Sequence, residues 1–193
     1  HLIRDNKDAS ADFEREDYYF TDAISDNAVN YIEDAQADKP LFLYVAYTAA
    51  HWPLHARDSD IAKYNGRYSK GWDQLRKERY ARMKKLGVIR EDTPLSPRNE
   101  DVPAWKDTEH REWQERRMET YAAQVHVMDQ GIGRIINSLK RTDRFENTLV
   151  MFMIDNGGCH VEYGEDRKGD YLPDQTRDGR PMRPGNLPHI MPG

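Results

Sequence analysis

An acid and an amide follow directly on a run of apolar residues: residues 148–154 lead into Asp155 and Asn156, and two glycines come next. A buried strand that ends in this way places oxygen side chains at the carboxyl edge of a sheet, where open α/β folds bind ligands. Carboxylate and amide oxygens are hard donors that suit Ca²⁺, with Mg²⁺ as the alternative. Gly157 and Gly158 are expected to accept positive φ and to let the backbone approach a ligand. Since Asp, Asn and Gly are also common turn residues, a plain strand-to-loop turn is the other interpretation.

A histidine occupies a comparable position after a second apolar run. Residues 41–47 lack strict alternation, as expected for a strand covered on both faces. This run leads through Thr48 and two alanines to His51, which is followed by Trp52 and Pro53. Imidazole titrates near neutral pH and proline stiffens the turn, so His51 is a candidate for proton transfer at a ligand site. A histidine with a purely structural role is the alternative.

Together the two segments resemble the sulfatases, the formylglycine-dependent sulfate ester hydrolases of the alkaline-phosphatase-like superfamily. The resemblance rests on Lys-Pro-Leu-Phe-Leu-Tyr at 39–44, Ala-His-Trp-Pro at 50–53 and Ile-Asp-Asn-Gly-Gly at 154–158, in that order. The long charged insertion between them is similar to that of bacterial arylsulfatases. The resemblance implies an α/β fold, an alkaline-phosphatase-like sandwich with a mainly parallel sheet flanked by helices, only partly covered by this chain.

The resemblance also implies roles for individual residues. Asp155 and Asn156 correspond to ligands of Ca²⁺, or alternatively Mg²⁺, and His51 corresponds to the residue that binds the sulfate ester near its bridging oxygen and protonates the departing alcohol. Weaker candidates for substrate contact lie in the following loop, where ordinary surface chemistry is the alternative: His160, Glu162 and Arg167. The implied substrate is a sulfate ester, for example a sulfated carbohydrate, and the implied location is the periplasm or the cell exterior.

The nucleophile motif of that family does not occur in the sequence. Sulfatases carry it as Cys-x-Pro-x-Arg or Ser-x-Pro-x-Arg, whose first residue is oxidised to formylglycine. Here Cys159 lacks the following proline and arginine, and the Ser-Pro-Arg at 96–98 has the wrong spacing. Because the chain also begins at His1 and ends in a loop at Gly193, residues 1–193 are predicted to be an internal part of a sulfatase catalytic domain, inactive alone, with formylglycine outside the segment.

Two other functions compete with sulfate ester hydrolysis. The first is a phosphatase, phosphodiesterase or phosphonate hydrolase of the same superfamily. Zinc-dependent members carry histidine directly after the corresponding aspartate, since imidazole suits zinc, whereas this chain has Asn156 there. The second is a non-catalytic, degenerate relative, which a nucleophile motif elsewhere in the protein would exclude.

Composition narrows the function classes further. The chain is 37% hydrophobic and 33% charged, with a mean hydropathy of −0.99, which is lean for an independent α/β domain. Residues 63–90 hold ten Lys or Arg against two acids, a local net charge of +8 in a chain of net charge −5. Such a charge run is typical of a solvated helix face, and steering of a polyanionic sulfated substrate is the alternative. Overall acidity and the lack of a reader motif argue against nucleic acid. The sequence has no run of 18 apolar residues, so it predicts no transmembrane helix.

The elements that must position these residues follow from periodicity. Helices are predicted over 21–37, 72–86 and from 108 or 111 to 140, and the first and last lead into the two apolar runs as helix–strand units of a parallel sheet. Residues 57–110 are predicted to be a charged, mostly helical insertion, and 165–193 a long loop. One apolar stripe of the last helix is predicted to face the core: Met118, Tyr121, Ala122, Val125, Met128, Ile132, Ile135, Ile136 and Leu139. In the same helix Gly131 and Gly133 are expected to allow close approach to the sheet.

Overall fold

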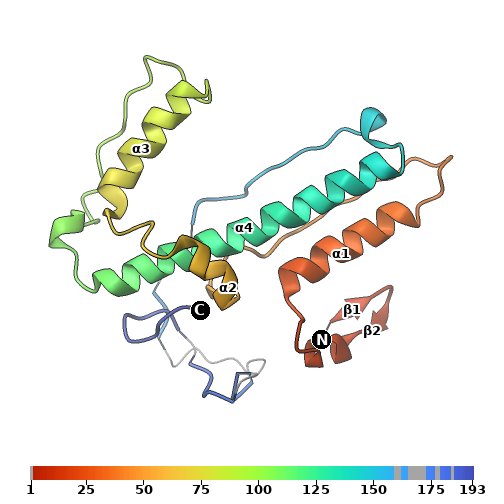
Figure 1. Cartoon of the computed structure of the whole chain (residues 1–193), viewed down its shortest axis with the longest axis horizontal. Helices are drawn as coiled ribbons and strands as arrows, with labels where there is room; N and C mark the ends of the chain where they lie inside the picture. Colours follow the sequence, from red (N-terminus) through yellow and green to blue (C-terminus); the bar gives the residue numbers. More distant parts are fainter. Residues whose placement is uncertain (1, 159–161, 165–172, 177–178, 184) are drawn as a thin grey trace. The chain divides into compact units, whose positions relative to one another are not determined.

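The computed structural model describes residues 2–158, 162–164, 173–176, 179–183 and 185–193. The chain divides into two units, each built from two of its stretches. The first unit comprises residues 1–53 and 124–185, and the second comprises residues 54–123 and 186–193. Figure 1 shows the elements of both units with the labels used below.

Helices dominate the described residues. The α-helices are α1 (Phe20–Glu33), α2 (Asp58–Ile61), α3 (Gly71–Lys85) and α4 (Arg111–Arg141), and the 3-10 helices are η1 (Ser10–Glu14), η2 (Ala62–Tyr64), η3 (Trp105–Asp107) and η4 (Phe145–Asn147). Strands β1 (Ile3–Arg4) and β2 (Lys7–Asp8) form an antiparallel hairpin with Ile3 opposite Asp8. The helices predicted over 72–86 and 111–140 are confirmed, whereas the helix predicted to reach residue 37 ends at Glu33.

In the first unit, helices α1 and α4 lie side by side and run in the same direction. Near the start of α1, Arg134 contacts Asp22 at 3.0 Å and Asp26 at 3.3 Å. At its end, Glu33 accepts hydrogen bonds from Arg141 and from Ser138. These bonds, that of Arg141 foremost, hold the pKa of the Glu33 carboxyl below its ordinary value. Parallel neighbouring helices are the arrangement that successive helix–strand units of an α/β fold require.

Arg144, just after α4, links the end of this helix to the residues that follow α1. Asp143 adopts a left-handed φ of 55°, and the Arg144 N–H donates to the Leu139 carbonyl at 2.9 Å, which closes the helix with a Schellman turn. The Arg144 guanidinium then donates to the carbonyls of Ala35 at 3.0 Å and Gln36 at 2.7 Å, just after α1. The segments that follow the two helices therefore begin at the same end of the helix pair.

The two apolar runs follow these helices as extended segments without regular strand pairing. Residues 40–48 and 148–154 belong to no strand in the structure, and Figure 1 shows each returning from its helix as an extended trace. In the first run exposed side chains alternate with the half-buried Leu43, Val45 and Tyr47, and in the second all are exposed; Phe42 is 92% and Leu149 85% exposed. A strand exists only when a neighbouring strand accepts and donates its backbone hydrogen bonds, and neither run has such a neighbour among the described residues. The predicted parallel sheet, and with it the sandwich, is not confirmed.

Gly131 is the point of closest packing in the first unit. A Cβ at this position would lie 2.1 Å from Ser25 Oγ, 3.0 Å from Ser25 Cβ and 3.1 Å from Tyr47 Oη. Ser25 is fully buried, and its hydroxyl contacts the Thr21 carbonyl at 2.9 Å and Tyr47 Oη at 2.8 Å. Helix α4, helix α1 and the extended segment at Tyr47 thus meet at one point. Gly131 therefore does allow close approach, but to helix α1 and an extended segment rather than to a sheet, and the expectation for Gly133 is wrong, since a Cβ there would meet nothing within 4 Å.

We expect Gly131→Ala to lower the free energy of unfolding of this chain by about 1–3 kcal/mol, because overpacking outweighs the gain in helix propensity. Ser25 cannot yield by rotating its hydroxyl, since its Cβ is also too close. Gly133→Ala, on the same helix but in open space, is the matched control and should raise stability by about 0.5–1 kcal/mol. Urea unfolding followed by circular dichroism measures both variants. Equal stabilisation by the two substitutions would contradict the close approach.

The buried face of α4 differs from the predicted apolar stripe. Apart from Trp113, Val127 and Leu139, its buried side chains are small or polar: Glu119, Thr120, Ala123, Gln124 and Ser138. The large apolar residues of the predicted stripe are only half-buried, and Tyr121 is 42% exposed. The prediction therefore holds for Leu139 and is wrong for the stripe as a whole. The residues of α4 that contact α1 are small or polar, Gly131 against Ser25, Arg134 against Asp22 and Ser138 against Glu33, and periodicity counted only apolar residues.

The second unit combines α2, α3 and the first part of α4 with the end of the chain. The Trp113 indole N–H donates to the Ile190 carbonyl at 3.1 Å, and Arg116 Nε donates to the Pro192 carbonyl at 3.1 Å. Helix α3 starts at Gly71, whose φ of 74° and missing Cβ leave room for the Trp105 ring, 1.9 Å from where a Cβ would stand. In the first turn of α3, the Asp73 carboxylate accepts a hydrogen bond from the Trp105 N–H and pairs with Arg98. Both contacts lower the pKa of Asp73.

Candidate functional site

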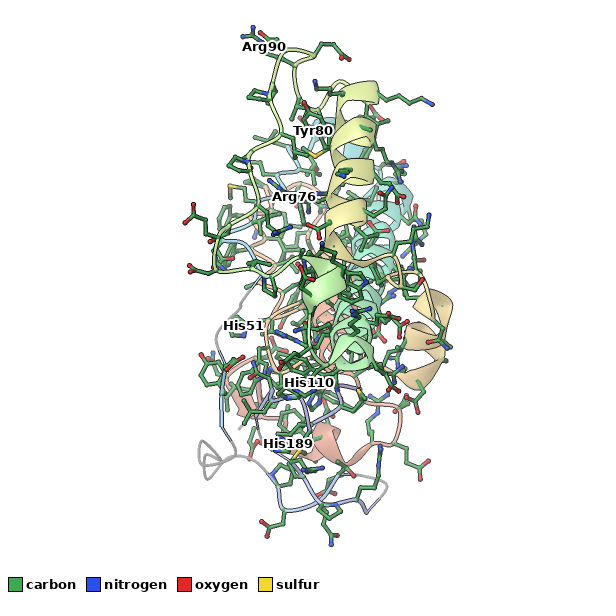
Figure 2. All side chains as sticks on the ribbon, turned by 90° about the vertical axis from the view of Figure 1, so that its left-hand side faces the viewer. His51, Arg76, Tyr80, Arg90, His110 and His189 are labelled. Atoms are coloured by element: carbon green, nitrogen blue, oxygen red, sulfur yellow. The ribbon has the colours of Figure 1, made fainter. Side chains whose placement is uncertain are left out.

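His51 lies in the loop that follows the first extended segment, and its backbone N–H donates to the Thr48 carbonyl at 2.8 Å. The imidazole Nδ1 lies 2.5 Å from the Trp52 carbonyl oxygen. A carbonyl can only accept, so Nδ1 carries the proton of this hydrogen bond. The neutral ring then presents Nε2 as an acceptor, and the imidazolium presents Nε2–H as a donor. The side chain is exposed, so Nε2 is available to an external group (Figure 2).

Asp155 and Asn156 lie in the loop after the second extended segment, and both are exposed. The Asn156 backbone N–H donates to Asp155 Oδ1 at 3.0 Å, and its side-chain amide nitrogen donates to the Gly157 carbonyl at 2.7 Å. The second contact fixes which end of the amide is nitrogen, so the Asn156 carboxamide oxygen points elsewhere. Within the described residues, that oxygen and Asp155 Oδ2 remain available as ligands.

The glycines after Asn156 behave differently from the prediction. Neither Gly157 nor Gly158 has positive φ, so the expected left-handed turn is wrong. The local turn is made instead by the side chains of Asp155 and Asn156, which bond to neighbouring backbone groups as such residues often do. A Cβ on Gly157 would meet nothing within 4 Å, so open space surrounds the backbone at this point.

An aromatic pair joins the two loops. Trp52, directly after His51, stacks on Tyr163, seven residues after Asn156, with ring centroids 4.4 Å apart and an interplanar angle of 21°. Arg144 joins the starts of the two extended segments, and this stack joins the loops in which they end. No motif in the sequence predicts a role for Tyr163. An aromatic residue soon after each motif was the available signal, although spacing alone does not pair them.

The donor set suits a hard divalent cation but is incomplete. The described residues contain no group of three His, Cys, Asp or Glu side chains able to hold a metal. One carboxylate and one carboxamide oxygen fit Ca²⁺ or Mg²⁺, which take six or more oxygen ligands in total. These two oxygens are too few to hold such an ion, so the remaining ligands would have to come from other residues.

The three weaker substrate-contact candidates are covered unevenly by the structure. Glu162 is described and exposed. His160 and Arg167 lie outside the described residues, as does much of the 165–193 loop. In the described part of that loop, Gln175 and Pro181 form an isolated antiparallel bridge. No helix among the described residues is long and apolar enough to cross a membrane.

Comparison with known proteins gives a consistent match. The model of the family named Sulfatase matches residues 3–179. An uncharacterised sulfatase of Schizosaccharomyces pombe is 38% identical over 143 residues, which cover 72% of this chain and 26% of that protein. The arylsulfatase of Klebsiella aerogenes is 36% identical over 144 residues, 74% of this chain and 31% of that protein. A sulfatase of Formosa agariphila is 29% identical over 149 residues, 72% of this chain and 19% of that protein.

These alignments cover a quarter to a third of the two most similar of these relatives, and the family match extends over nearly all of this chain. It includes the His51 loop, the Asp155–Asn156 loop and both helices that precede them. The chain belongs to the sulfatase family.

Proposed function

We propose that this chain supplies the metal-binding and proton-donating part of an enzyme that hydrolyses sulfate esters. The observation that carries the proposal is the pairing of the two loops. Each follows a helix and an extended segment, the segments begin together at Arg144, and the Trp52–Tyr163 stack joins the loops that hold His51 and Asp155. Membership of the sulfatase family supplies the reaction class, hydrolysis of a sulfuric ester.

Asp155 and Asn156 would hold the cation, for which Ca²⁺ is the first choice and Mg²⁺ the second. When bound, such an ion supplies positive charge that stabilises the sulfate oxygens as the S–O bond breaks. The Asp155 carboxylate contributes charge to the site, and the Asn156 oxygen contributes a neutral ligand. The bond from the Asn156 amide nitrogen to the Gly157 carbonyl keeps that oxygen oriented.

His51 would act on the leaving group. With Nδ1 bonded to the Trp52 carbonyl, a protonated ring holds its second proton at Nε2 and can give it to the bridging ester oxygen as the alcohol departs. The carbonyl also fixes the ring plane, so that the proton is presented in one direction. The Trp52 ring, stacked on Tyr163, holds this backbone in place.

The nucleophile would come from outside these residues. The 193 residues hold no Cys-x-Pro-x-Arg or Ser-x-Pro-x-Arg motif. We therefore expect no turnover by this chain alone, and full activity only where it is part of a protein that also carries a formylglycine.

Metal content is the most direct test of the proposed function. In an enzyme that contains this chain and the nucleophile motif, elemental analysis should find calcium or magnesium bound stoichiometrically. Asn156 is the reason, because the zinc-dependent phosphoryl-transfer members have histidine at this position, where imidazole suits the softer ion. Stoichiometric zinc, together with faster hydrolysis of an aryl phosphate than of the matching aryl sulfate, would replace the proposal with a phosphatase.

A further inference from the structure

One face of helix α3 holds the segment that follows the helix in sequence. Its residues at four-residue steps donate hydrogen bonds to main-chain carbonyls of the irregular segment 91–103, which returns along the helix (Figure 2). The donors and acceptors run in opposite order: Trp72 to Pro103 at 3.0 Å, Arg76 to Ser96 at 2.6 Å and Pro97 at 3.2 Å, Tyr80 to Thr93 at 2.5 Å, and Lys84 to Glu91. We call this the inner face of α3.

Three cations lie on another face of the same helix. Arg79, Arg82 and Lys85 follow one another at three-residue steps, and all three side chains are exposed. We call them the outer row. Within the described residues they have no ion pair, because the two acids of α3 are engaged elsewhere, Asp73 with Arg98 at 2.9 Å and Glu78 with Lys70 at 3.4 Å.

Helix stability alone does not explain why three cations are clustered in the outer row. Like charges three residues apart repel one another and weaken a helix. The helix dipole favours cations in the last turn, which accounts for Arg82 and Lys85, but it does not extend to Arg79. Around α3, Arg76 and Lys84 donate hydrogen bonds on the inner face, and Lys70 and Arg98 pair with acids from the flanking loops, whereas the outer row has no ion pair within the described residues.

We propose that the outer row of α3 binds a polyanion that carries sulfate groups, such as a sulfated carbohydrate chain. The inference rests on the proposed hydrolysis of sulfate esters, and it adds a second contact surface to it. Guanidinium groups bind tetrahedral oxyanions through two parallel hydrogen bonds. Steps of three residues along a helix set the cations about 4.5 Å apart along its axis, so successive groups of an extended polyanion meet successive side chains.

The geometry of α3 disfavours nucleic acid as the partner. Single-stranded nucleic acid binds to cationic surfaces that also offer aromatic rings for base stacking. The aromatic residues of α3, Trp72 and Tyr80, both donate hydrogen bonds on the inner face, and Trp72 also packs edge-on against Trp105 at 4.8 Å. The outer row therefore offers charge without a stacking surface, which suits sulfate groups on a carbohydrate.

The test compares dextran sulfate with unsulfated dextran, which differ only in the sulfate groups, by calorimetry with this chain at low ionic strength. We expect dextran sulfate to bind and dextran not to bind. Arg79→Gln/Arg82→Gln/Lys85→Gln should weaken binding by about tenfold, as expected for the loss of three solvent-exposed ion pairs. The charge-matched control replaces three exposed lysines outside α3, Lys7→Gln/Lys39→Gln/Lys106→Gln, and should keep most of the affinity.

Equal losses in the two triple variants would overturn the proposal, since net charge alone would then explain binding. Equal or tighter binding of polyuridylate RNA, lost in the outer-row variant, would also overturn it and assign the row to nucleic acid. The circular dichroism of both variants checks that α3 stays folded. The assay needs no turnover, no metal and no His51, so its failure leaves the proposed function standing, and a zinc result leaves the binding result standing.

Discussion

Replacing Asp155 with alanine should remove the bound divalent cation and lower the hydrolysis of an aryl sulfate by at least about a hundredfold, a loss typical of removing one group that stabilises developing charge. The experiment uses an enzyme that contains this chain together with the nucleophile motif. Asp155 is the only charged member of the Asp155–Asn156 pair, so its loss removes both a ligand and the charge that offsets the ion. Metal content and kcat/KM are measured on the same preparation.

A matched control for this change is Asp129→Ala, because Asp129 is also an exposed aspartate of the first unit, on helix α4. That variant should keep its metal and its activity. Full calcium or magnesium occupancy in Asp155→Ala would contradict the ligand assignment, even if activity fell. Lost metal with retained activity would show that the ion has no part in the reaction.

Replacing His51 with alanine should lower turnover by about 10²–10⁴-fold, the range expected when a general acid is removed. The loss should depend on the leaving group. An activated aryl sulfate, whose phenolate departs readily, should lose least, and an alkyl sulfate, whose alkoxide needs a proton, should lose most. Rates for a series of esters of increasing leaving-group pKa measure this dependence, and bound metal should stay at the level of the unaltered enzyme.

The control for that series is His110→Asn, which removes an exposed imidazole from a backbone of φ 50° that asparagine also tolerates. It should leave all rates unchanged. A uniform loss across the ester series in His51→Ala would argue that His51 only binds the sulfate group. Activity within a few-fold of the unaltered enzyme would remove His51 from the reaction.

The helices were predictable from sequence because each carries its signal locally. Helix α4 shows apolar residues at three- and four-residue steps and ends at Lys140 and Arg141, and the predicted bounds match the observed ones within one residue at the C-terminus. Helix α1 ends at Glu33, before the predicted end, and the carbonyls of Ala35 and Gln36 beyond it bind Arg144, more than one hundred positions later in sequence. A contact over that distance leaves no trace in local periodicity.

The sheet could not be confirmed because strand pairing is a property of two segments. The run at 148–154 has the composition of a buried strand, yet it has no neighbouring strand among the described residues, and Ile154 is 77% exposed. The candidate site was predictable in its residues but not in the contact that joins its loops. His51, Asp155 and Asn156 stand out by residue type and by their place after apolar runs. The Trp52–Tyr163 stack that joins their loops depends on tertiary contact, so no spacing rule could find it.

Apart from the Ser96 hydroxyl, which also accepts from Arg76, the inner face of α3 holds segment 91–103 through main-chain oxygens, which every residue type supplies, proline included. These main-chain hydrogen bonds do not depend on the side chains that segment 91–103 carries. Substitutions along 91–103 should therefore cost little stability, except at Arg98, whose side chain pairs with Asp73, whereas substitutions of Trp72, Arg76, Tyr80 and Lys84 should cost more. The exposed side chains of segment 91–103 can thus differ between relatives while its path along α3 stays the same.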